Sequence, residues 1–397
     1  GKVIIFRSWM EILALFYVAL IWKDPHYRPK FNLILWAVTA FMFVFGLTSV
    51  LGVNRYQSFW GTLERMGGWF TFFHFWLFFV MMTSVLKKFS DWLFFIKISV
   101  FVSFLSTLYG FLQRADTAVV VGGGRSRIFG TIGNPALFAG YELVNVFFAL
   151  VILWRRTVTK NAKIFYGVIA LLNLLAIAFT AVRGSLLAIV VSAVVFVIFL
   201  AHLGGSKKIR NTLWLGLIVL VTLEGLLILN RQSELVRNSP YLSRLSDVSF
   251  ETRTVNTRFW AWQAGLDGWN DSFKTILVGW GPENFNLPFS KHFNPRFYRG
   301  PASEKLFDRG HNMFVEVLVT MCLLGLVSYV VLLVVLGRTA AHIFKKSLSR
   351  DTKLTVAALW AGLVAYIIHN TFIFDTSANF MMFFLMMGLV YFLRQNL

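Results

Sequence analysis

"IFYGVIALLNLLAIAFTAVRGSLLAIVVSAVVFVIFLAHL", residues 164–203, is a nearly unbroken apolar stretch. As one straight α-helix it would be about 60 Å long, at about 1.5 Å per residue, which is roughly twice the hydrocarbon thickness of a bilayer. The chain must therefore fold back within the stretch, and Arg183-Gly184 is the polar break at which it can do so. The stretch predicts two membrane-spanning helices joined by a tight turn.

Apolar runs of similar length recur along the whole chain. The 397 residues are 57% hydrophobic and only 14% charged, more apolar surface than a soluble domain of this size needs, since a single core stops growing with length. We therefore predict an all-α polytopic membrane protein with about eleven transmembrane helices in this chain and one large extracytoplasmic loop domain. The predicted spans are 7–22, 31–52, 67–86, 92–113, 131–154, 164–182, 184–203, 212–230, 311–336, 354–373 and 377–393.

The short loops predict the orientation. When the spans alternate, the basic short loops all fall on one side, which the positive-inside rule makes cytoplasmic. Residues 231–310 hold eleven lysines and arginines but lie on the other side, because long loops cross membranes largely regardless of charge. The basic short loops carry Lys23, Arg28 and Lys30; Lys87 and Lys88; Arg155, Arg156, Lys160 and Lys163; Lys207, Lys208 and Arg210; and Arg338, Lys345, Lys346, Arg350 and Lys353.

Three regions follow from this topology: N-terminal transmembrane helices over 1–230, the extracytoplasmic loop over 231–310 with an amphipathic helix at about 255–268, and C-terminal transmembrane helices over 311–397. Eleven spans place the first residue outside, where Lys2 and Arg7 are unfavourable, and the chain has no initiator Met. We expect one further span to precede it and the natural protein to have about twelve.

The charge and the motifs narrow the partners. The net charge of +20 resides in loops between apolar spans rather than on one soluble face, which favours membrane lipids or a lipid-carried diphosphate over nucleic acid. The single cysteine, Cys322, lies in a predicted span, so it forms no disulfide framework and no cysteine-based zinc site. The external loop has no cluster with metal-ligand spacing, and no Walker or Gly-x-Ser-x-Gly motif occurs. We therefore expect neither a metal nor a cofactor.

One polar cluster on the predicted external side precedes the fifth span. Arg125 and Arg127 come before a Gly-rich helix entrance that ends in Gly133 and Asn134. Backbone amides at such an entrance can hold anionic oxygens, and arginine binds phosphate bidentately. The alternative is a loop whose arginines touch lipid headgroups.

Two further arginines share that face. Arg183 stands at the hairpin, where an arginine near hydrocarbon is costly unless it is paired or snorkels. Arg258 lies beside Trp260 and Trp262 on the amphipathic helix, where it could sit over the membrane surface. The alternative for Arg183 is a side chain that snorkels to the membrane surface as an anchor. The alternative for Arg258 is a place on a simple interfacial helix. Neither alternative involves a catalytic role.

A histidine completes the external set in "FDRGHNMFVEV", residues 307–317. His311 lies at a helix entrance that disfavours the imidazolium form, so it suits a neutral base near pH 7. A structural histidine is the alternative. Its polar neighbours in this stretch are Asp308, Arg309, Asn312 and Glu316.

Together these residues predict a transfer reaction at one external site. The external face holds no ATP, so the donor must bring its own activation, as a lipid diphosphate does. Arginines would stabilise the departing diphosphate, and His311 would take the proton of an incoming hydroxyl. We expect Arg125, Arg183, Arg258 and His311 to converge on one cavity at the external membrane edge.

An ordered set of short motifs resembles the O-antigen ligase family, which also contains O-antigen polymerases and some protein O-oligosaccharyltransferases. The motifs extend from about residue 58 to residue 326. Two departures are Ala136, where many members have Asn, and Val182, where Ser commonly precedes the hairpin arginine. The matching pieces are "SFWGTLERMGGWF" (58–70), "RIFGTIGNPALFAGY" (127–141), "TAVRGSLLA" (180–188), "TRFWAWQAGL" (257–266), "GWGPENF" (279–285) and "HNMFVEVLVTMCLLGL" (311–326).

The resemblance implies an inverting, metal-independent transfer of a glycan from undecaprenyl diphosphate to an acceptor hydroxyl on the periplasmic face of the bacterial inner membrane. It implies that Arg183 and Arg258 hold the diphosphate and that His311 lies near the acceptor, with His311 and Arg258 as the catalytic pair. We expect further diphosphate contacts from Arg125, Arg127 and Arg309, and a cavity lining of Arg65, Asn134, Asn312 and Glu316.

The acceptor stays open between a glycolipid, a growing glycan and a protein, because the same donor chemistry serves a ligase, a polymerase and a protein transferase. A transporter of lipid-linked glycans is a further alternative. It would place charged residues on both halves of the spans and interrupt helices at mid-membrane. This chain instead concentrates its polar groups at one face.

Overall fold

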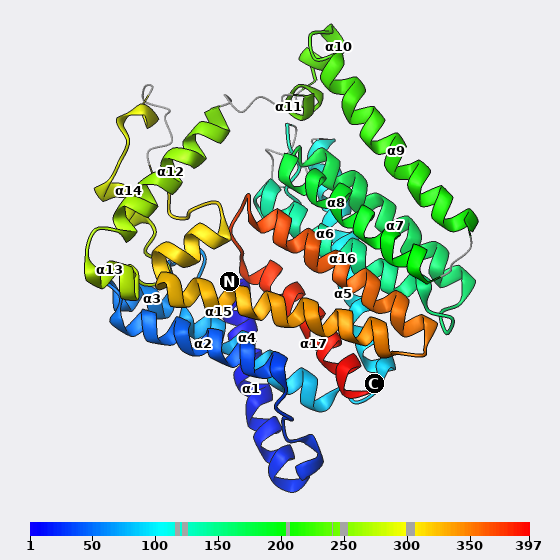
Figure 1. Cartoon of the computed structure of the whole chain (residues 1–397), viewed down its shortest axis with the longest axis horizontal. Helices are drawn as coiled ribbons and strands as arrows, with labels where there is room; N and C mark the ends of the chain where they lie inside the picture. Colours follow the sequence, from blue (N-terminus) through cyan, green and yellow to red (C-terminus); the bar gives the residue numbers. More distant parts are fainter. Residues whose placement is uncertain (116–119, 121–125, 204–206, 240, 247–252, 299–305) are drawn as a thin grey trace. The chain divides into compact units, whose positions relative to one another are not determined.

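The structure is a computed structural model that describes residues 1–397 apart from 116–119, 121–125, 204–206, 240, 247–252 and 299–305. In the described part of the chain the regular elements are all helices, so the predicted all-α class is confirmed (Figure 1). In chain order they are α1 (Lys2–Lys23), η1 (Pro25–Tyr27), α2 (Leu33–Leu51), α3 (Arg55–Trp60), α4 (Trp69–Val85), α5 (Phe89–Arg114), α6 (Pro135–Trp154), α7 (Lys160–Phe179), α8 (Arg183–His202), α9 (Lys207–Leu229), α10 (Glu234–Arg237), α11 (Leu242–Ser246), α12 (Arg253–Trp269), α13 (Phe273–Val278), α14 (Asn286–Lys291), η2 (Pro295–Phe297), α15 (Met313–Lys346), α16 (Arg350–Asn370) and α17 (Ser377–Gln395).

Helices of membrane-spanning length account for most of the chain. Among the described residues, nine helices are long and apolar enough to cross a membrane. Helix α4 and the segment Trp214–Leu229 of α9 are shorter apolar helices. Each of the eleven predicted spans falls on one of these helices, and the chain is a polytopic membrane protein. The nine are α1, α2, α5, α6, α7, α8, α15, α16 and α17.

The apolar stretch at 164–203 is broken as expected, but at 180–182, just before Arg183-Gly184, which form the first two residues of the second helix. Helix α7 ends at Phe179, and α8 begins at Arg183. Between them Ala181 adopts φ +51°, a left-handed conformation that a right-handed helix cannot continue through. The Thr180 hydroxyl donates to the carbonyl of Ile177 at 2.6 Å, which satisfies one of the last carbonyls of α7.

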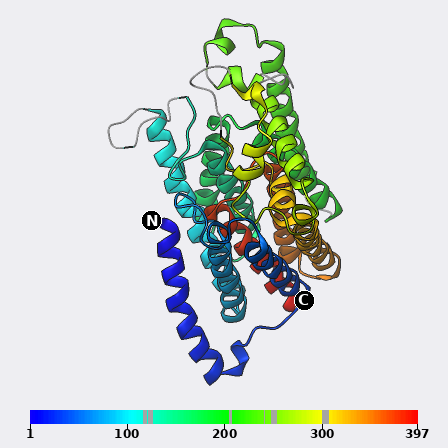
Figure 2. The same cartoon turned by 90° about the vertical axis from the view of Figure 1, so that its left-hand side faces the viewer.

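The chain divides into two compact units. The first comprises 1–87, 250–336 and 370–392. Within it α1 packs on α4, where the rings of Phe6 and Phe75 stack at 4.6 Å. Figure 2 shows α1 running down to the short turn that precedes α2. The ring of Phe75 also stacks on that of Phe384 of α17, at 5.6 Å, so aromatic side chains form much of this core.

The second unit comprises 88–249, 337–369 and 393–397. Buried polar side chains join three of its helices. Thr107 of α5 donates to Asn173 of α7 at 3.1 Å, and Asn173 donates to Ser103 at 2.8 Å. Ser99 donates to Asn145 of α6 at 2.6 Å. Such bonds between helices contribute to packing where apolar side chains gain little over lipid.

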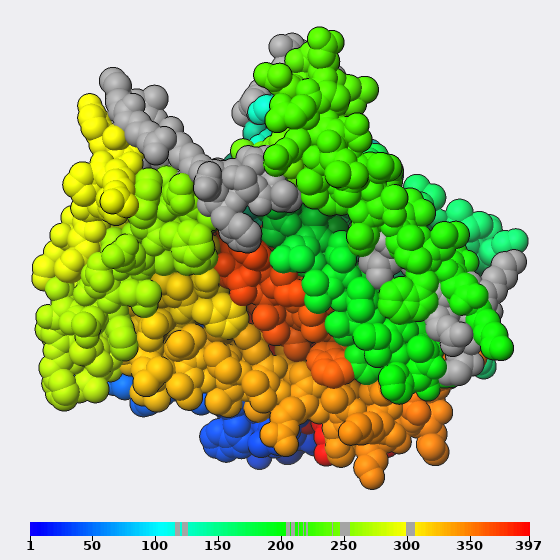
Figure 3. Space-filling view, turned by 45° about the horizontal axis from the view of Figure 1, so that its top comes forward, coloured from blue at the N-terminus to red at the C-terminus, as the bar shows by residue number. Residues whose placement is uncertain are grey.

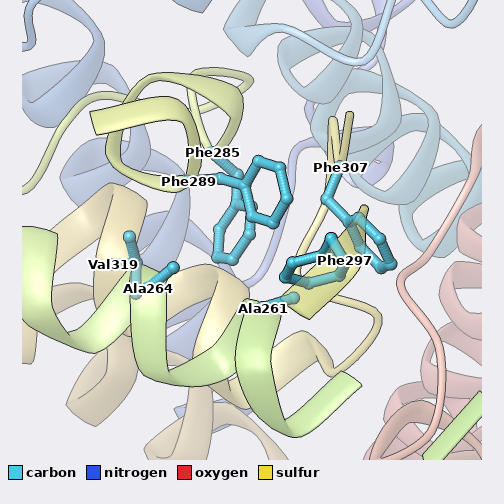
Figure 4. Packing of buried hydrophobic residues seen from close by; sticks show 7 residues of the cluster. All are labelled: Ala261, Ala264, Phe285, Phe289, Phe297, Phe307 and Val319. Carbon is cyan, nitrogen blue, oxygen red and sulfur yellow. The ribbon is translucent and has the colours of Figure 1, made fainter. Parts of the chain in front are cut away.

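The predicted extracytoplasmic segment carries its own small aromatic core. Ala261 and Ala264 of α12 lie against Phe285, Phe289, Phe297 and Phe307, and Val319 of α15 joins them (Figure 4). Because the α12 side chains at this contact are small, the helix can approach the phenylalanines closely. Figure 3 shows α12 to α14, in yellow-green and yellow, lying over the first part of α15. This packing places the middle of α12 against the residues that precede α15.

Candidate functional site

His311 lies two residues before α15, in a left-handed conformation with φ +50°. Its Nδ1 is 3.1 Å from the carbonyl oxygen of Arg309. A carbonyl can only accept, so Nδ1 carries the proton of the neutral ring, and the lone pair lies on Nε2. The rings of Phe307 and Phe374 contact the imidazole edge to face, at 5.2 and 5.3 Å between centroids. The histidine is therefore held with one nitrogen ready to accept a proton.

The surroundings of His311 keep it neutral. Burial lowers the pKa of the imidazole to about 4, and the positive charges of Arg258 and Arg65 act in the same direction. The hydrogen bond to the Arg309 carbonyl and the charge of Asp308 oppose this shift without cancelling it. The helix entrance was the expected reason for a neutral histidine, whereas burial is the largest cause in the structure.

Arg258 is brought to the histidine by α12. It is partly buried, and its charge is close enough to lower the pKa of His311. On the next turn of the same helix, Trp262 donates from Nε1 to the carbonyl of Gly310 at 2.6 Å. This bond ties α12 to the loop that carries His311. The predicted catalytic pair thus lies within one compact unit.

Arg65 joins the same neighbourhood from the stretch before α4. Its Nε donates to Asp308 Oδ2 at 2.8 Å, and its guanidinium lies 4.6 Å from the centre of the Phe374 ring. Both partners are partly exposed. The structure places Arg65 beside the His311 loop, where the sequence predicted a cavity-lining role for it.

Arg309 occupies a different position from the one expected of a diphosphate ligand. Its guanidinium lies between Glu283, which Nη2 contacts, and Glu316, whose Oε1 is 3.2 Å from Nη1. The three side chains are only 11%, 2% and 6% exposed. Burial alone would lower the pKa of Arg309, but the two carboxylates outweigh burial and raise it. Arg309 therefore stays positively charged, and its charge is already paired with Glu283 and Glu316 rather than open to a diphosphate.

Glu283 was not singled out from the sequence, although "GWGPENF" marks its position. In that turn Gly279 and Gly281 have φ +78° and +91°. The turn lies against a break in α15, where Cys322 has φ +56°. The amides of Trp280 and Gly281 donate to the carbonyls of Val319 and Thr320 at 3.1 and 2.8 Å, and these are carbonyls that a broken helix leaves without their usual partners. The continuous span predicted from residue 311 is thus interrupted, and the interruption anchors the turn that carries Glu283.

Two predicted cavity-lining asparagines are used as helix caps. The Asn312 side chain accepts from the amides of Phe314 and Val315 at 2.9 and 3.2 Å at the start of α15. Asn134 accepts from the amides of Ala136 and Leu137 in the same way at the start of α6. Asparagine is a preferred residue at this position because its oxygen satisfies amides that have no partner within the helix.

The second unit carries the other predicted arginines. Arg183 is the first residue of α8, and Arg127 donates from Nε to the carbonyl of Thr180 at 2.7 Å in the turn before it. The guanidinium of Arg114, which was not among the predicted site residues, lies 4.1 Å from the ring centre of Tyr241. Arg125 lies outside the described residues. The convergence of Arg183 with His311, which belong to different units, remains a prediction.

A comparison with protein families gives one match. Residues 168–330 match the family described as O-antigen ligase, Wzy_C. The matched segment contains Arg183, Arg258 and His311, and it includes both glutamates that hold Arg309. A search of curated proteins gives no match.

Proposed function

Because residues 168–330 belong to the O-antigen ligase family, whose members transfer glycans, we propose that this membrane protein moves a glycan from undecaprenyl diphosphate to an acceptor hydroxyl. The observation that carries the proposal is the geometry of His311. A neutral imidazole with a bare Nε2 lies beside the charge of Arg258, so a proton acceptor and an anion-binding group occur together.

In the proposed step the acceptor oxygen attacks the anomeric carbon of the glycan. The hydroxyl proton passes to Nε2 of His311, and the bond from the anomeric carbon to the diphosphate oxygen breaks. The diphosphate leaves with the bonding electrons, so negative charge develops on it. A single displacement of this kind inverts the configuration at the anomeric carbon.

Arg258 is the group we assign to that developing charge, because guanidinium binds diphosphate oxygens bidentately and its charge acts close to His311. Arg183 and Arg127 are assigned the same role from the second unit. Arg309 is not, since Glu283 and Glu316 already surround it. We assign the reaction to the side of the membrane opposite the basic short loops. The resemblance to the O-antigen ligase family makes this side the periplasmic face of the bacterial inner membrane.

The test is turnover of the purified full chain with a lipid-linked oligosaccharide. His311→Ala should reduce turnover by about 10²–10⁴-fold, the usual contribution of a general base, with the melting temperature and donor binding near the parental values. A well-folded variant within a few-fold of the parent would refute the role of His311. Supplying lipid A core, lipid-linked glycan and protein acceptors in separate reactions distinguishes ligase, polymerase and protein transferase.

A further inference from the structure

We propose that Glu283, Arg309 and Glu316 are positioning residues that hold His311 with Nε2 facing the acceptor. This inference rests on the proposed function, because it assigns a purpose to the three side chains only if His311 accepts a proton. Hereafter the three are called the buried triad.

Hydrogen bonds connect the buried triad to the loop that carries His311 at consecutive residues, Arg309 to His311. Glu316 Oε2 accepts from the amide of Gly310 at 2.6 Å, and Glu316 Oε1 pairs with the Arg309 side chain. The carbonyl of Arg309 is the group that accepts from His311 Nδ1. One side chain of α15 therefore fixes the backbone on both sides of the carbonyl that selects the histidine tautomer. The left-handed φ of His311 is a conformation that needs such support.

The burial of the triad makes a purely structural explanation weak. A guanidinium lies between two carboxyl groups, and all three side chains are nearly buried. Replacing a buried ionic cluster by apolar side chains of similar size is often neutral or stabilising, so stability alone is a poor reason for such a cluster. Holding the backbone beside a reacting group in one geometry is a functional explanation for such a cluster.

A third segment encloses the triad. The amide of Thr62 donates to Glu283 Oε2 at 3.4 Å, and Gln57 donates to the Glu283 carbonyl at 2.7 Å. A Cβ added at Gly67 would lie 2.7 Å from Glu283 Oε1 and 3.3 Å from Arg309 Nη2. The "SFWGTLERMGGWF" stretch thus covers the carboxylate so closely that a methyl group at Gly67 would displace it. Gly67→Ala disturbs the triad without changing any charge.

The pH dependence offers a readout that separates positioning from folding. The charged groups that act on His311 are Arg258 on α12, Arg65 on the stretch before α4, and Asp308 on its own loop. A relaxed loop would let water reach the imidazole, and the acid-side inflection of turnover would then rise from the region of pH 4 toward about 6.5, the ordinary histidine value.

The experiment measures kcat, the donor KM and the pH profile of the full chain carrying Glu283→Gln or Glu316→Gln. Loss of an outer partner of a metal-binding histidine typically costs about 10- to 100-fold, and we take the same size for a histidine that acts as a base. We expect a fall of that size in kcat, a donor KM within about threefold of the parent, and the upward shift of the inflection. Asp271→Asn is the matched control, because its carboxylate pairs with Lys291 at 2.6 Å in the same predicted loop and takes no part in the triad.

The outcomes separate the two proposals. If His311→Ala keeps parental turnover, the proposed function fails and this inference fails with it. If His311→Ala is inactive but both folded glutamine variants keep the parental kcat and pH profile, the inference alone is overturned. A loss confined to donor KM also overturns it, since that result would assign the triad to donor binding. If neither glutamine variant folds, Gly67→Ala tests the inference instead, by the same kcat, donor KM and pH profile. Parental values of all three in that variant would overturn it.

Discussion

At the scale of single residues, the side chain of His311 owes its chemistry to its neighbours. The Arg309 carbonyl selects the tautomer, and burial between aromatic rings keeps the ring neutral. Neutral histidine is the form that can accept a proton, so the environment supports the base role at every pH above the lowered pKa.

The first prediction concerns pH. Since the pKa of His311 is lowered to about 4, turnover should be flat from pH 7 down to about 5 and should fall as the pH approaches 4, where protonation fills Nε2. The sign follows from the base role, because only the deprotonated form is active. The measurement is kcat against pH for parent and His311→Ala. An inflection that persists unchanged in the residual activity of the variant would assign it to another group.

The second prediction concerns Arg258. Arg258→Ala should reduce kcat/KM for the lipid-linked donor by more than tenfold. Arg258→Lys should restore only part of the loss, because ammonium lacks the bidentate fork of guanidinium. The measurement is steady-state kinetics with varied donor at saturating acceptor. Full activity of the alanine variant would leave Arg258 as an anchor at the membrane surface.

At the scale of elements, the site depends on how α15 begins. The helix start is capped by Asn312, which is the neighbour of His311, so one short segment carries both the cap and the base. Helix α12 reaches this segment because its small side chains pack on the aromatic cluster. A shift of either helix would therefore move a charged side chain relative to the imidazole of His311.

The third prediction compares two caps of the same geometry. Asn312→Ala should cost about 1 kcal/mol of unfolding free energy and should also reduce kcat, because the first turn of α15 then frays beside His311. Asn32 caps α2 by the same pair of amide bonds, at 3.0 and 3.1 Å, on the predicted cytoplasmic side. Asn32→Ala should cost a similar amount and leave kcat unchanged. Thermal unfolding and turnover on the same preparations make the comparison, and an equal loss of turnover in both variants would contradict it.

At the scale of the whole molecule, the proposed chemistry needs no metal, because the arginines supply the positive charge. Within the described residues, no three His, Cys, Asp or Glu side chains gather as metal ligands would. The fourth prediction is that transfer persists in excess EDTA. Complete loss of activity that magnesium restores would overturn it.

The fifth prediction tests the orientation of the chain. In a Cys322→Ala background, an impermeant maleimide added to intact cells should label Ser126→Cys and Leu306→Cys but not Leu348→Cys. All three positions are exposed in the structure, so access to the reagent depends on the side of the membrane. Labelling of residue 348 alone would reverse the predicted topology and place Arg127 and His311 in the cytoplasm.

The sequence by itself determined the helical class, the eleven apolar helices and the break before Arg183, because length and apolarity alone decide which segments can cross a bilayer. It also singled out His311, at the entrance of an apolar helix, and Arg258, beside tryptophans on an amphipathic helix, as candidates for the site. Only the tertiary structure decided what those residues contact. The partners of Arg309 are Glu283, from a turn 26 residues earlier, and Glu316, from the following helix. Periodicity and composition carry no information about this pairing, because it depends on how the turn that carries Glu283 packs against the break in α15. The pairing distinguishes Arg309, whose charge already has partners within the protein, from Arg258, to which we assign the diphosphate.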